Sequence, residues 1–201
     1  MKHEREIKLI LAFYAISALV FLFFGDQITR IDEQIFLQIN QIRNTWLDYF
    51  FIAITVGGST IFWSLLIVLF WLGKKKKTAY CLLATFLIDS ITLFETKLLF
   101  NRPRPGETYS NLKILDLEIG KSFPSAHSER AFSGATIISL FHRNLRPVLY
   151  ILSALVAISR IFVGVHYPLD VIYGSVNGIL IGYLVMNLPM EKIKKKIRKL
   201  F

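Results

Sequence analysis

The sequence predicts an all-α integral membrane protein with six transmembrane helices and an interfacial amphipathic helix. Hydrophobic residues make up 54% of the 201 residues and the mean hydropathy is +0.50, well above the values of an ordinary soluble domain. Several apolar runs also approach the roughly 20 residues that a helix needs to cross the hydrocarbon core, where backbone polar groups must be satisfied within the segment. We expect residues 1–201 to form a single membrane domain.

The apolar runs define six predicted spans in chain order: residues 7–24, 58–72, 78–99, 128–141, 147–165 and 169–188. The first lacks the small-residue cleavage site of a signal peptide, so we expect a retained helix. The second could begin earlier, because residues 46–56 are also apolar and Gly57-Gly58 could mark a break. The fourth is short for a full crossing, so its polar first turn should be buried inside the bundle.

Basic residues predict the orientation of these spans. They cluster before the first span, between the second and third, between the fourth and fifth, and after the sixth; with six spans, these 15 of the 24 Lys and Arg fall on one side. The positive-inside rule makes that side cytoplasmic, together with both termini. The net charge of +10 is then mostly a topology signal, and basic residues dispersed among loops argue against a nucleic-acid partner.

Three polar clusters fall on the opposite side, and the first runs from Lys97 to Pro105. Pro103 and Pro105 prevent the third span from continuing and impose extended geometry on the residues before them. Arg104 can then fold back toward Lys97, and the two offer a bidentate cation and a point charge for a phosphate. Taken alone, this cluster fits snorkelling basic anchors at the membrane interface better.

The second cluster is Pro124-Ser125-Ala126-His127, just before the fourth span. Proline suits the first turn of a helix, and the free N–H groups of a helix start suit a phosphate oxygen, to which the Ser125 hydroxyl would add a donor. His127 would lie beside a leaving oxygen and can donate a proton near neutral pH. In isolation the cluster fits a capped helix with an exposed histidine.

The third cluster is Ser159-Arg160 followed by His166 and Asp170. Because Pro168 cannot donate to the carbonyl one turn earlier, we expect His166 just before the sixth span and Asp170 in its first turn. The carboxylate can then accept a hydrogen bond from one ring nitrogen and leave the other as a nucleophile, while Arg160 neutralises phosphate charge. The simpler alternative is a helix-capping Asp beside a surface His.

Together the clusters resemble the signature of the type 2 phosphatidic acid phosphatase family, which is Lys-x6-Arg-Pro, Pro-Ser-Gly-His and Ser-Arg-x5-His-x3-Asp. The first and third motifs match in full, whereas Ala126 replaces the glycine of the second. An alanine would be strained at positive φ, but we expect a helical first turn, which accepts it.

The resemblance implies a metal-independent hydrolase with no cofactor, which acts through a phosphohistidine at the extracytoplasmic end of the bundle. The absence of any Cys, His or carboxylate cluster with metal-ligand spacing agrees with this expectation. The implied catalytic residues are His166 as the nucleophile, Asp170 as its orienting partner and His127 as the general acid. The implied phosphate-binding residues are Lys97, Arg104, Ser125 and Arg160.

The resemblance also implies a lipid phosphate substrate drawn from the outer leaflet of the cell membrane. Among bacterial members, the expectation is undecaprenyl pyrophosphate, the glycan carrier of the cell wall, with phosphatidylglycerophosphate and phosphatidic acid as alternatives. A diphosphate would place an extra charge near Arg102 or Lys121. A phosphatase of soluble phosphoesters stays open, as does a non-catalytic transporter or lipid binder, although a pure anion binder has no need of the His166–Asp170 pair.

Other polar residues lead to weaker predictions. Asp89 lies within the third span, where a lone charge is costly, so it should face the bundle interior or be protonated. Glu129 and Arg130 either tune substrate choice or are structural. An amphipathic helix is predicted over residues 28–43, in the outer interface or folded over the bundle, and a basic amphipathic tail on anionic lipid after residue 191. The first of these rests on a stripe formed by Ile28, Ile31, Ile35, Ile39 and Ile42.

Overall fold

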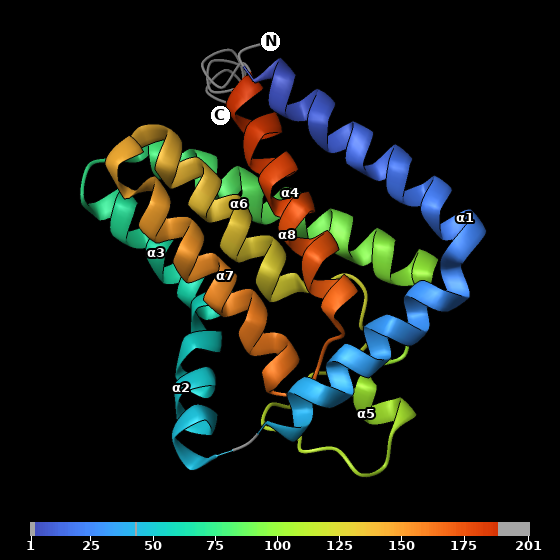
Figure 1. Ribbon diagram of the computed structural model, residues 1–201. Coiled ribbons are helices and arrows are strands. Elements are labelled where there is room, and N and C mark those ends of the chain that lie inside the picture. The colour runs from blue at the N-terminus through green and yellow to red at the C-terminus, as the bar shows by residue number, and fades with distance from the viewer. Residues whose placement is uncertain (1–2, 43, 189–201) are drawn as a thin grey trace.

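The chain folds into helices joined by short connections and one long loop (Figure 1). The computed structural model describes residues 3–42 and 44–188, so the predicted basic tail lies outside the described residues. Within the described part, the elements are α1 (Glu4–Gln41), α2 (Thr45–Thr55), η1 (Val56–Gly58), α3 (Thr60–Leu72), α4 (Lys76–Phe100), α5 (Pro105–Thr108), α6 (Ala126–Phe141), η2 (Arg143–Leu145), α7 (Arg146–Phe162) and α8 (Pro168–Asn187).

Each of the six predicted spans coincides with a helix, but fewer meet the length and composition of a membrane span. Among the described helices, three are long and apolar enough: α1, the segment Arg143–Phe162, and α8. The pair α2 and α3 would make a fourth, as one broken span bent by 53°. The expected break at Gly57-Gly58 is confirmed, because both residues lie in the 3₁₀ turn between the two helices. With 16 residues, α6 is too short to cross a bilayer, as its sequence indicated.

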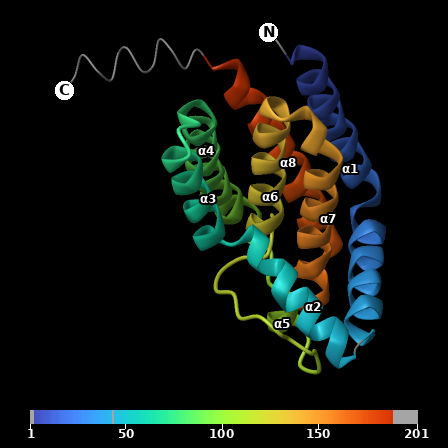
Figure 2. The same cartoon turned by 90° about the vertical axis from the view of Figure 1, so that its left-hand side faces the viewer.

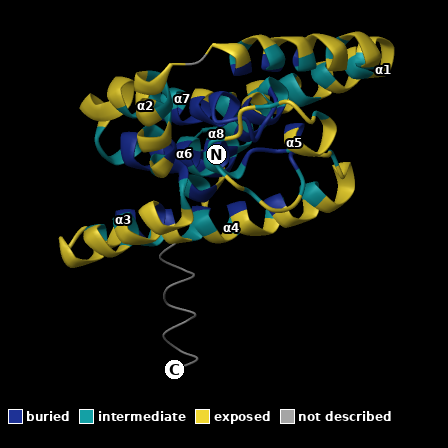
Figure 3. Cartoon of the chain, turned by 90° about the horizontal axis from the view of Figure 1, so that it is seen from below, coloured by how far each residue is buried: buried dark blue, intermediate teal, exposed yellow. Residues whose placement is uncertain are grey.

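The helices α6, α7 and α8 form the buried centre, and α1, α3 and α4 surround it with exposed outer faces (Figure 3). These outer faces are apolar: Leu22, Ile61 and Leu99 are each more than 70% exposed. An exterior of large exposed apolar side chains is what a multi-pass membrane protein presents to lipid.

Glycines on one face of α8 let it lie directly against α6. Small residues at every fourth position allow helix backbones to approach closely. A Cβ on Gly178 would come within 2.2 Å of the Glu129 carbonyl oxygen. At the helix starts, the backbone N–H of Ser125 donates to the carbonyl of Asp170 at 2.9 Å, so main-chain contacts join the second and third motifs. The glycines of this face are Gly174, Gly178 and Gly182.

The predicted interfacial helix is not separate; it is the second arm of α1. The two arms meet at Phe24, whose φ of −128° and ψ of 17° are not helical. The second arm buries Asp32, Phe36 and Asn40 against the protein, whereas Ile31 of the isoleucine stripe is 54% exposed. Because Phe36 belongs to a buried cluster with residues of α7 and α8, the arm is folded over the bundle.

The two ends of the bundle differ. The start of α1 and the end of α8 lie at one end, and α5, the long connection from α4 to α6, and the start of α8 lie at the other (Figure 2). All three sequence motifs therefore meet at one end of the bundle.

Candidate active site

The first motif ends α4 as its prolines require. Asn101 takes the left-handed conformation with φ of 46°, and Arg104 is extended at the start of the short helix α5, which has Pro105 in its first turn. This turn directs Arg104 into the protein, where it is 7% exposed. Its Nε donates to the Gly120 carbonyl at 2.8 Å and its Nη1 to the Val165 carbonyl at 2.9 Å.

The second motif does not place Pro124 in the first turn of α6 as predicted, because the helix begins two residues later. Ser125 is the N-cap and Ala126 the first helical residue, so the expected fit of alanine is confirmed. The Ser125 hydroxyl accepts a hydrogen bond from the Ser128 hydroxyl at 3.1 Å. His127 lies against η1, where a Cβ on Gly58 would come within 2.6 Å of the His127 Cβ.

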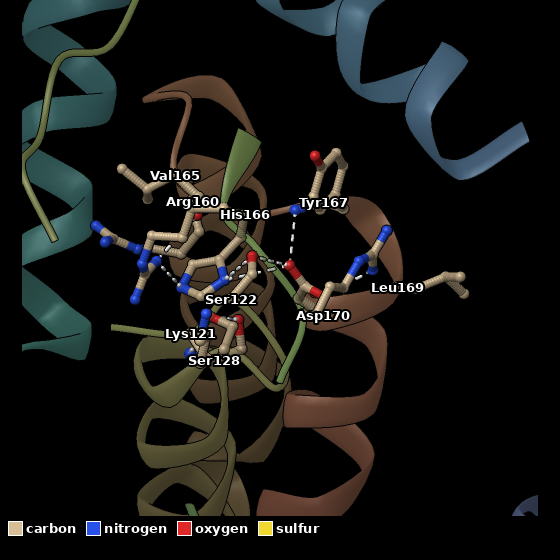
Figure 4. Close-up of polar contacts among 12 residues, drawn as sticks. Lys121, Ser122, Ser128, Arg160, Val165, His166, Tyr167, Leu169 and Asp170 are labelled. Carbon is tan, nitrogen blue, oxygen red and sulfur yellow. Dashed lines mark hydrogen bonds and ion pairs between the residues drawn. The ribbon is translucent and has the colours of Figure 1, made fainter. Parts of the chain in front are cut away.

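The third motif places His166 just before α8 and Asp170 in its first turn, as predicted. Nδ1 of His166 is 3.4 Å from Oδ2 of Asp170, at the long end for a hydrogen bond. The same Oδ2 accepts hydrogen bonds from the backbone N–H of Tyr167 at 2.9 Å and from the Ser122 hydroxyl at 2.5 Å (Figure 4). His166, Ser122 and Asp170 are fully buried.

The carboxylate of Glu118 joins four groups of the three motifs. Its Oε2 lies 2.8 Å from Nη2 of Arg104 and 3.3 Å from Nε2 of His166. Its Oε1 lies 2.5 Å from Nη2 of Arg160 and 3.0 Å from Nδ1 of His127. We call Arg104, His127, Arg160 and His166 the anion pocket, because one anion touches all four.

Arg160 has further partners from distant elements. Its Nη1 donates to the Thr55 hydroxyl at the end of α2 and to Oδ2 of Asp116 at 2.8 Å. Within the described part of the chain its Nε is buried without a hydrogen-bond partner. The hydrogen bonds described for Arg160 thus use three of the five N–H donors of its guanidinium.

The surroundings of Glu118 keep it ionised. Burial by itself would raise the pKa of this carboxyl, but hydrogen bonds from His127 and His166 and the charge of Arg160 outweigh it and hold the pKa well below its usual range. The groups of the anion pocket thus stabilise a charged carboxylate.

Two of the predicted phosphate-binding residues, Lys97 and Ser125, are not part of the anion pocket. Lys97 donates from Nζ to the backbone carbonyl of Lys121. Ser125 is fully buried, and the contacts described for its hydroxyl lie within the first turn of α6. Neither side chain contacts Glu118 in the described structure.

Arg102, expected beside a second phosphate, is paired at both terminal nitrogens. Nη1 lies 2.8 Å from Oδ1 of Asp170 and Nη2 lies 2.6 Å from Oδ2 of Asp32. Its guanidinium also stacks 4.0 Å from the centre of the Tyr167 ring. Arg102 therefore connects the second arm of α1 to the start of α8.

Two acidic residues behind the candidate site, one on α4 and one on α6, are buried inside the bundle. Asp89 faces inward as predicted, with the Ser133 hydroxyl donating to its Oδ2 at 2.7 Å. Glu129 accepts hydrogen bonds from Thr92 at 3.0 Å and Asn177 at 2.9 Å, and it is fully buried. These contacts bridge α4, α6 and α8 and support the structural alternative for Glu129.

Comparison with known proteins identifies the family. Residues 76–194 match the PAP2 superfamily, which is more than half of the chain. The chain belongs to the PAP2 superfamily. The family resemblance drawn from the three motifs is thereby confirmed, and with it a lipid phosphatase of a multi-pass membrane family.

Individual known proteins resemble the chain to different extents. It is 36% identical to the bacitracin transport permease protein BcrC of Bacillus licheniformis over 59% of this chain and 61% of that protein. It is 27% identical to an undecaprenyl-diphosphatase of Sulfolobus acidocaldarius over 94% of this chain and 96% of that protein. The crystal structure of a transmembrane PAP2-type phosphatidylglycerolphosphate phosphatase from Bacillus subtilis matches with a TM-score of 0.77 at 26% identity, over 96% of this chain and 97% of that one.

Some residues of the site carried no recognisable signal in the sequence. They lie in the long loop or on α1, and their contacts depend on how these segments fold back over the motifs. An acidic residue in a loop that faces basic motifs is the one feature that could have pointed to Glu118. The residues concerned are Asp32, Asp116, Glu118 and Ser122.

Proposed function

We propose that this PAP2 protein hydrolyses a lipid phosphate or diphosphate without a metal ion, through a phosphohistidine at the extracytoplasmic face. The observation that carries the proposal is the anion pocket, in which two arginines and two histidines surround one carboxylate. A phosphoryl group in that position would have its charge neutralised by the arginines and would lie between the two histidines.

The surroundings of His166 suit it to act as the nucleophile. Nδ1 faces the Asp170 carboxylate, and Nε2 lies 3.2 Å from Nη1 of Arg104, an obligate donor. While Glu118 is in place, an Nε2–H can donate to its carboxylate. Once a phosphoryl group replaces Glu118, Asp170 and Arg104 would favour the tautomer with its hydrogen on Nδ1 and a lone pair on Nε2. Nε2 would attack phosphorus as the bond to the leaving oxygen breaks.

His127 is positioned to serve the leaving group. Its Nδ1 lies 3.0 Å from Oε1 of Glu118, on the oxygen opposite to the one facing His166. We assign His127 the proton donated to the leaving oxygen. It would then take a proton from the water that cleaves the phosphohistidine and releases inorganic phosphate, which returns both histidines to their starting state.

An apolar cavity near the site favours a lipid substrate. A cavity of about 700 Å³ lies between α1, α4 and α8. The residues that contact Glu118 are not part of its wall; the link is Arg102, which lines the cavity and contacts Asp170. Aromatic and aliphatic side chains dominate the lining, including Ala18, Phe21, Phe100, Phe123, Leu169 and Tyr173.

Within the lipid phosphates, a polyprenyl diphosphate such as undecaprenyl pyrophosphate is our first choice. The undecaprenyl-diphosphatase relative aligns over nearly the whole chain. A diphosphate also has phosphate as its leaving group, which needs less protonation than an alkoxide. Because both terminal nitrogens of Arg102 are paired, Lys121 is the better of the two expected contacts for the second phosphate. Phosphatidylglycerophosphate and phosphatidic acid are the alternatives.

A transport or lipid-binding function is the second candidate, since one relative carries the name of a transport permease. Such a protein could use the arginines of the anion pocket. It would have no use for a buried His166 held between Asp170, Ser122 and Arg104. The histidine geometry therefore favours the hydrolase.

The proposal is tested by phosphate release from purified protein with a polyprenyl diphosphate, phosphatidylglycerophosphate, phosphatidic acid and a soluble phosphoester. We expect the highest kcat/KM with the polyprenyl diphosphate, and no loss of activity when a chelator is added. A large preference for the soluble compound would refute the lipid substrate. Strong inhibition by the chelator would refute the metal-independent reaction.

A cavity-filling variant separates lipid binding from chemistry. Ala18→Trp should fill the cavity, so KM for a lipid phosphate should rise, whereas hydrolysis of a short soluble phosphoester should not change. Equal effects on both substrates would show that the cavity does not hold the lipid chain.

A further inference from the structure

Arg102 and Asp32 form an ion-pair chain that ends on Asp170. Arg102 lies between the two carboxylates, at 2.6 Å from Asp32 and 2.8 Å from Asp170. The Asp32 and Asp170 side chains are 1% and 0% exposed, and that of Arg102 is 19% exposed. Two carboxylates this deeply buried need a shared cation, since an uncompensated buried charge is strongly destabilising.

Asp32 also holds the backbone on which Asp170 lies. Its Oδ1 accepts a hydrogen bond from the N–H of Leu169 at 2.8 Å, in the first turn of α8. One carboxylate of α1 thus holds both the arginine that contacts Asp170 and the peptide next to Asp170.

We propose that Asp32 and Arg102 are positioning residues that orient Asp170 toward His166. Arg102 binds Oδ1 of Asp170, which leaves Oδ2 for the His166 ring and its other donors. Fixing one oxygen of a carboxylate fixes the direction of the other, and a misplaced orienting group of about 1 Å can cost about a hundredfold in rate. The roles of His166 and Asp170 in this proposal rest on the proposed function.

The test compares Asp32→Asn and Arg102→Lys with the matched control Glu33→Gln. Glu33 lies next to Asp32 on α1 and accepts a hydrogen bond from Tyr109 at 3.0 Å, so the control removes a neighbouring carboxylate charge, while the amide oxygen can still accept from Tyr109. We expect kcat to fall about 10- to 100-fold in both test variants, with KM within about twofold and with Glu33→Gln near wild type.

The outcomes separate this proposal from the proposed function. If wild-type protein turns over and His166→Ala does not, but both test variants match wild type, the positioning roles are wrong and the hydrolase stands. A raised KM at unchanged kcat for Arg102→Lys alone would make Arg102 a substrate contact instead. Asp32→Glu, which keeps the charge, should recover part of kcat; equal losses in Asp32→Glu and Asp32→Asn, with a lowered unfolding temperature, would indicate a purely structural role.

A second, independent observation concerns the segment that carries Glu118. Backbone hydrogen bonds hold the loop on either side, from Leu115 to Val163 and from Ser122 to Arg102, both at 2.9 Å. Between these points Leu117 and Ile119 point outward and are more than 90% exposed. The acidic side chains of Asp116 and Glu118 hold the segment over the anion pocket, together with hydrogen bonds from Arg104 and Lys97 to the Gly120 and Lys121 carbonyls.

We infer that Glu118 competes with the phosphoryl group for the anion pocket and so determines which anions can bind. Its two oxygens use the same donors that the proposed mechanism gives to phosphate. A ligand must displace this carboxylate, which favours a dianionic phosphoryl group over weaker monoanions. The return of Glu118 would also assist the release of inorganic phosphate. This assignment of the pocket to phosphate rests on the proposed function.

Binding of inorganic phosphate tests the competition without turnover. Glu118→Gln keeps the size of the side chain and removes its charge, so inorganic phosphate should bind about tenfold more tightly, measured by the concentration dependence of the unfolding temperature. The matched control is Asp116→Asn, because Asp116 is also on this loop and contacts Arg160 at 2.8 Å but not the other three groups.

Each result has a distinct meaning. Tighter phosphate binding by Glu118→Gln but not by Asp116→Asn supports the competition, and a lower KM for the lipid phosphate should accompany it. Equal binding by Glu118→Gln and wild type would refute the competition. A lower kcat with unchanged phosphate binding would instead assign Glu118 a role in the reaction. If phosphate binds no variant, the phosphate assignment of the pocket fails with the proposed function.

Discussion

The two ring nitrogens of His166 have different surroundings, and this difference supports its proposed role as the nucleophile. Nδ1 faces Asp170 and Ser122, and Nε2 faces Arg104 and the carboxylate of Glu118. The ring is fully buried, so its orientation depends on these partners and not on solvent. A residue held in this way can repeat one reaction geometry in every turnover.

At the residue scale, we predict that His166→Ala abolishes turnover, because no other group would form the bond to phosphorus. His127→Ala should retain activity with good leaving groups and lose about 10²- to 10⁴-fold with poor ones, the usual contribution of a general acid. The measurement is kcat for a series of phosphoesters whose leaving groups differ in pKa. Near-normal hydrolysis by His166→Ala would contradict the phosphohistidine, and a uniform loss across the series would contradict the role of His127.

The lowered pKa of Glu118 predicts how its contribution to stability depends on pH. A carboxyl whose pKa is lowered on folding stabilises the protein above its unfolded pKa of about 4.3, and this contribution is lost as pH falls toward the folded value. Without phosphate, the unfolding temperature of wild type should exceed that of Glu118→Gln at pH values above the unfolded pKa. The difference should shrink below about pH 4.3; a difference that grows with acid would reverse the assigned sign.

At the element scale, two close approaches hold the histidines. The glycine face of α8 brings it against α6, and Gly58 of the bent α2–α3 pair lies against His127. A side chain at either contact would separate elements that carry different motifs. Helix packing and the geometry of the candidate site thus depend on small residues at these contacts.

Gly58→Ala should displace His127, because the added Cβ would come within 2.6 Å of the His127 Cβ. We expect kcat to fall most with poor leaving groups, in the same pattern as His127→Ala but more weakly. Gly57→Ala is the matched control, since its nearest neighbour is the Val156 side chain at 3.1 Å. Similar losses in both variants would mean that the bend of the helix pair, and not the contact with His127, matters.

Local sequence features predicted the helices and the order of the motifs, because they depend on neighbouring residues. Pro168 was sufficient to place His166 before α8 and Asp170 in its first turn. The contacts of Glu118 and Asp32 could not be predicted, since each depends on where a distant segment folds. The isoleucine stripe predicted this helix and left open whether it lies in the interface or is folded over the bundle. The structure shows the folded arrangement, in which Asp32, Phe36 and Asn40 are the buried residues of this arm.

At the scale of the whole molecule, the candidate active site lies at the end of the bundle opposite to the start of α1 and the end of α8. The α4–α6 connection and the start of α8 lie at one end of the bundle, and the start of α1 and the end of α8 lie at the other (Figure 2). The excess of Lys and Arg in the loops of the second end predicts that this end is cytoplasmic.

Cysteine labelling in intact cells tests this orientation. In a Cys81→Ser background, Asn111→Cys should react with an impermeant thiol reagent, because Asn111 is exposed in the loop at the end that holds the site. Lys75→Cys, exposed between α3 and α4, should react only after the membrane is permeabilised. The reverse pattern would place the site in the cytoplasm.

The close packing of α8 against α6 affects how the substrate of such a protein can change through mutation. Backbone contact along the glycine face, together with the Ser125–Asp170 main-chain bond, makes the two histidine-bearing motifs parts of one rigid block. Arg104, Glu118 and the cavity wall of α1 lie on separate segments. We therefore expect that mutations in the α1 wall of the cavity can change which lipid is held and leave the relative position of the two proposed catalytic histidines unchanged.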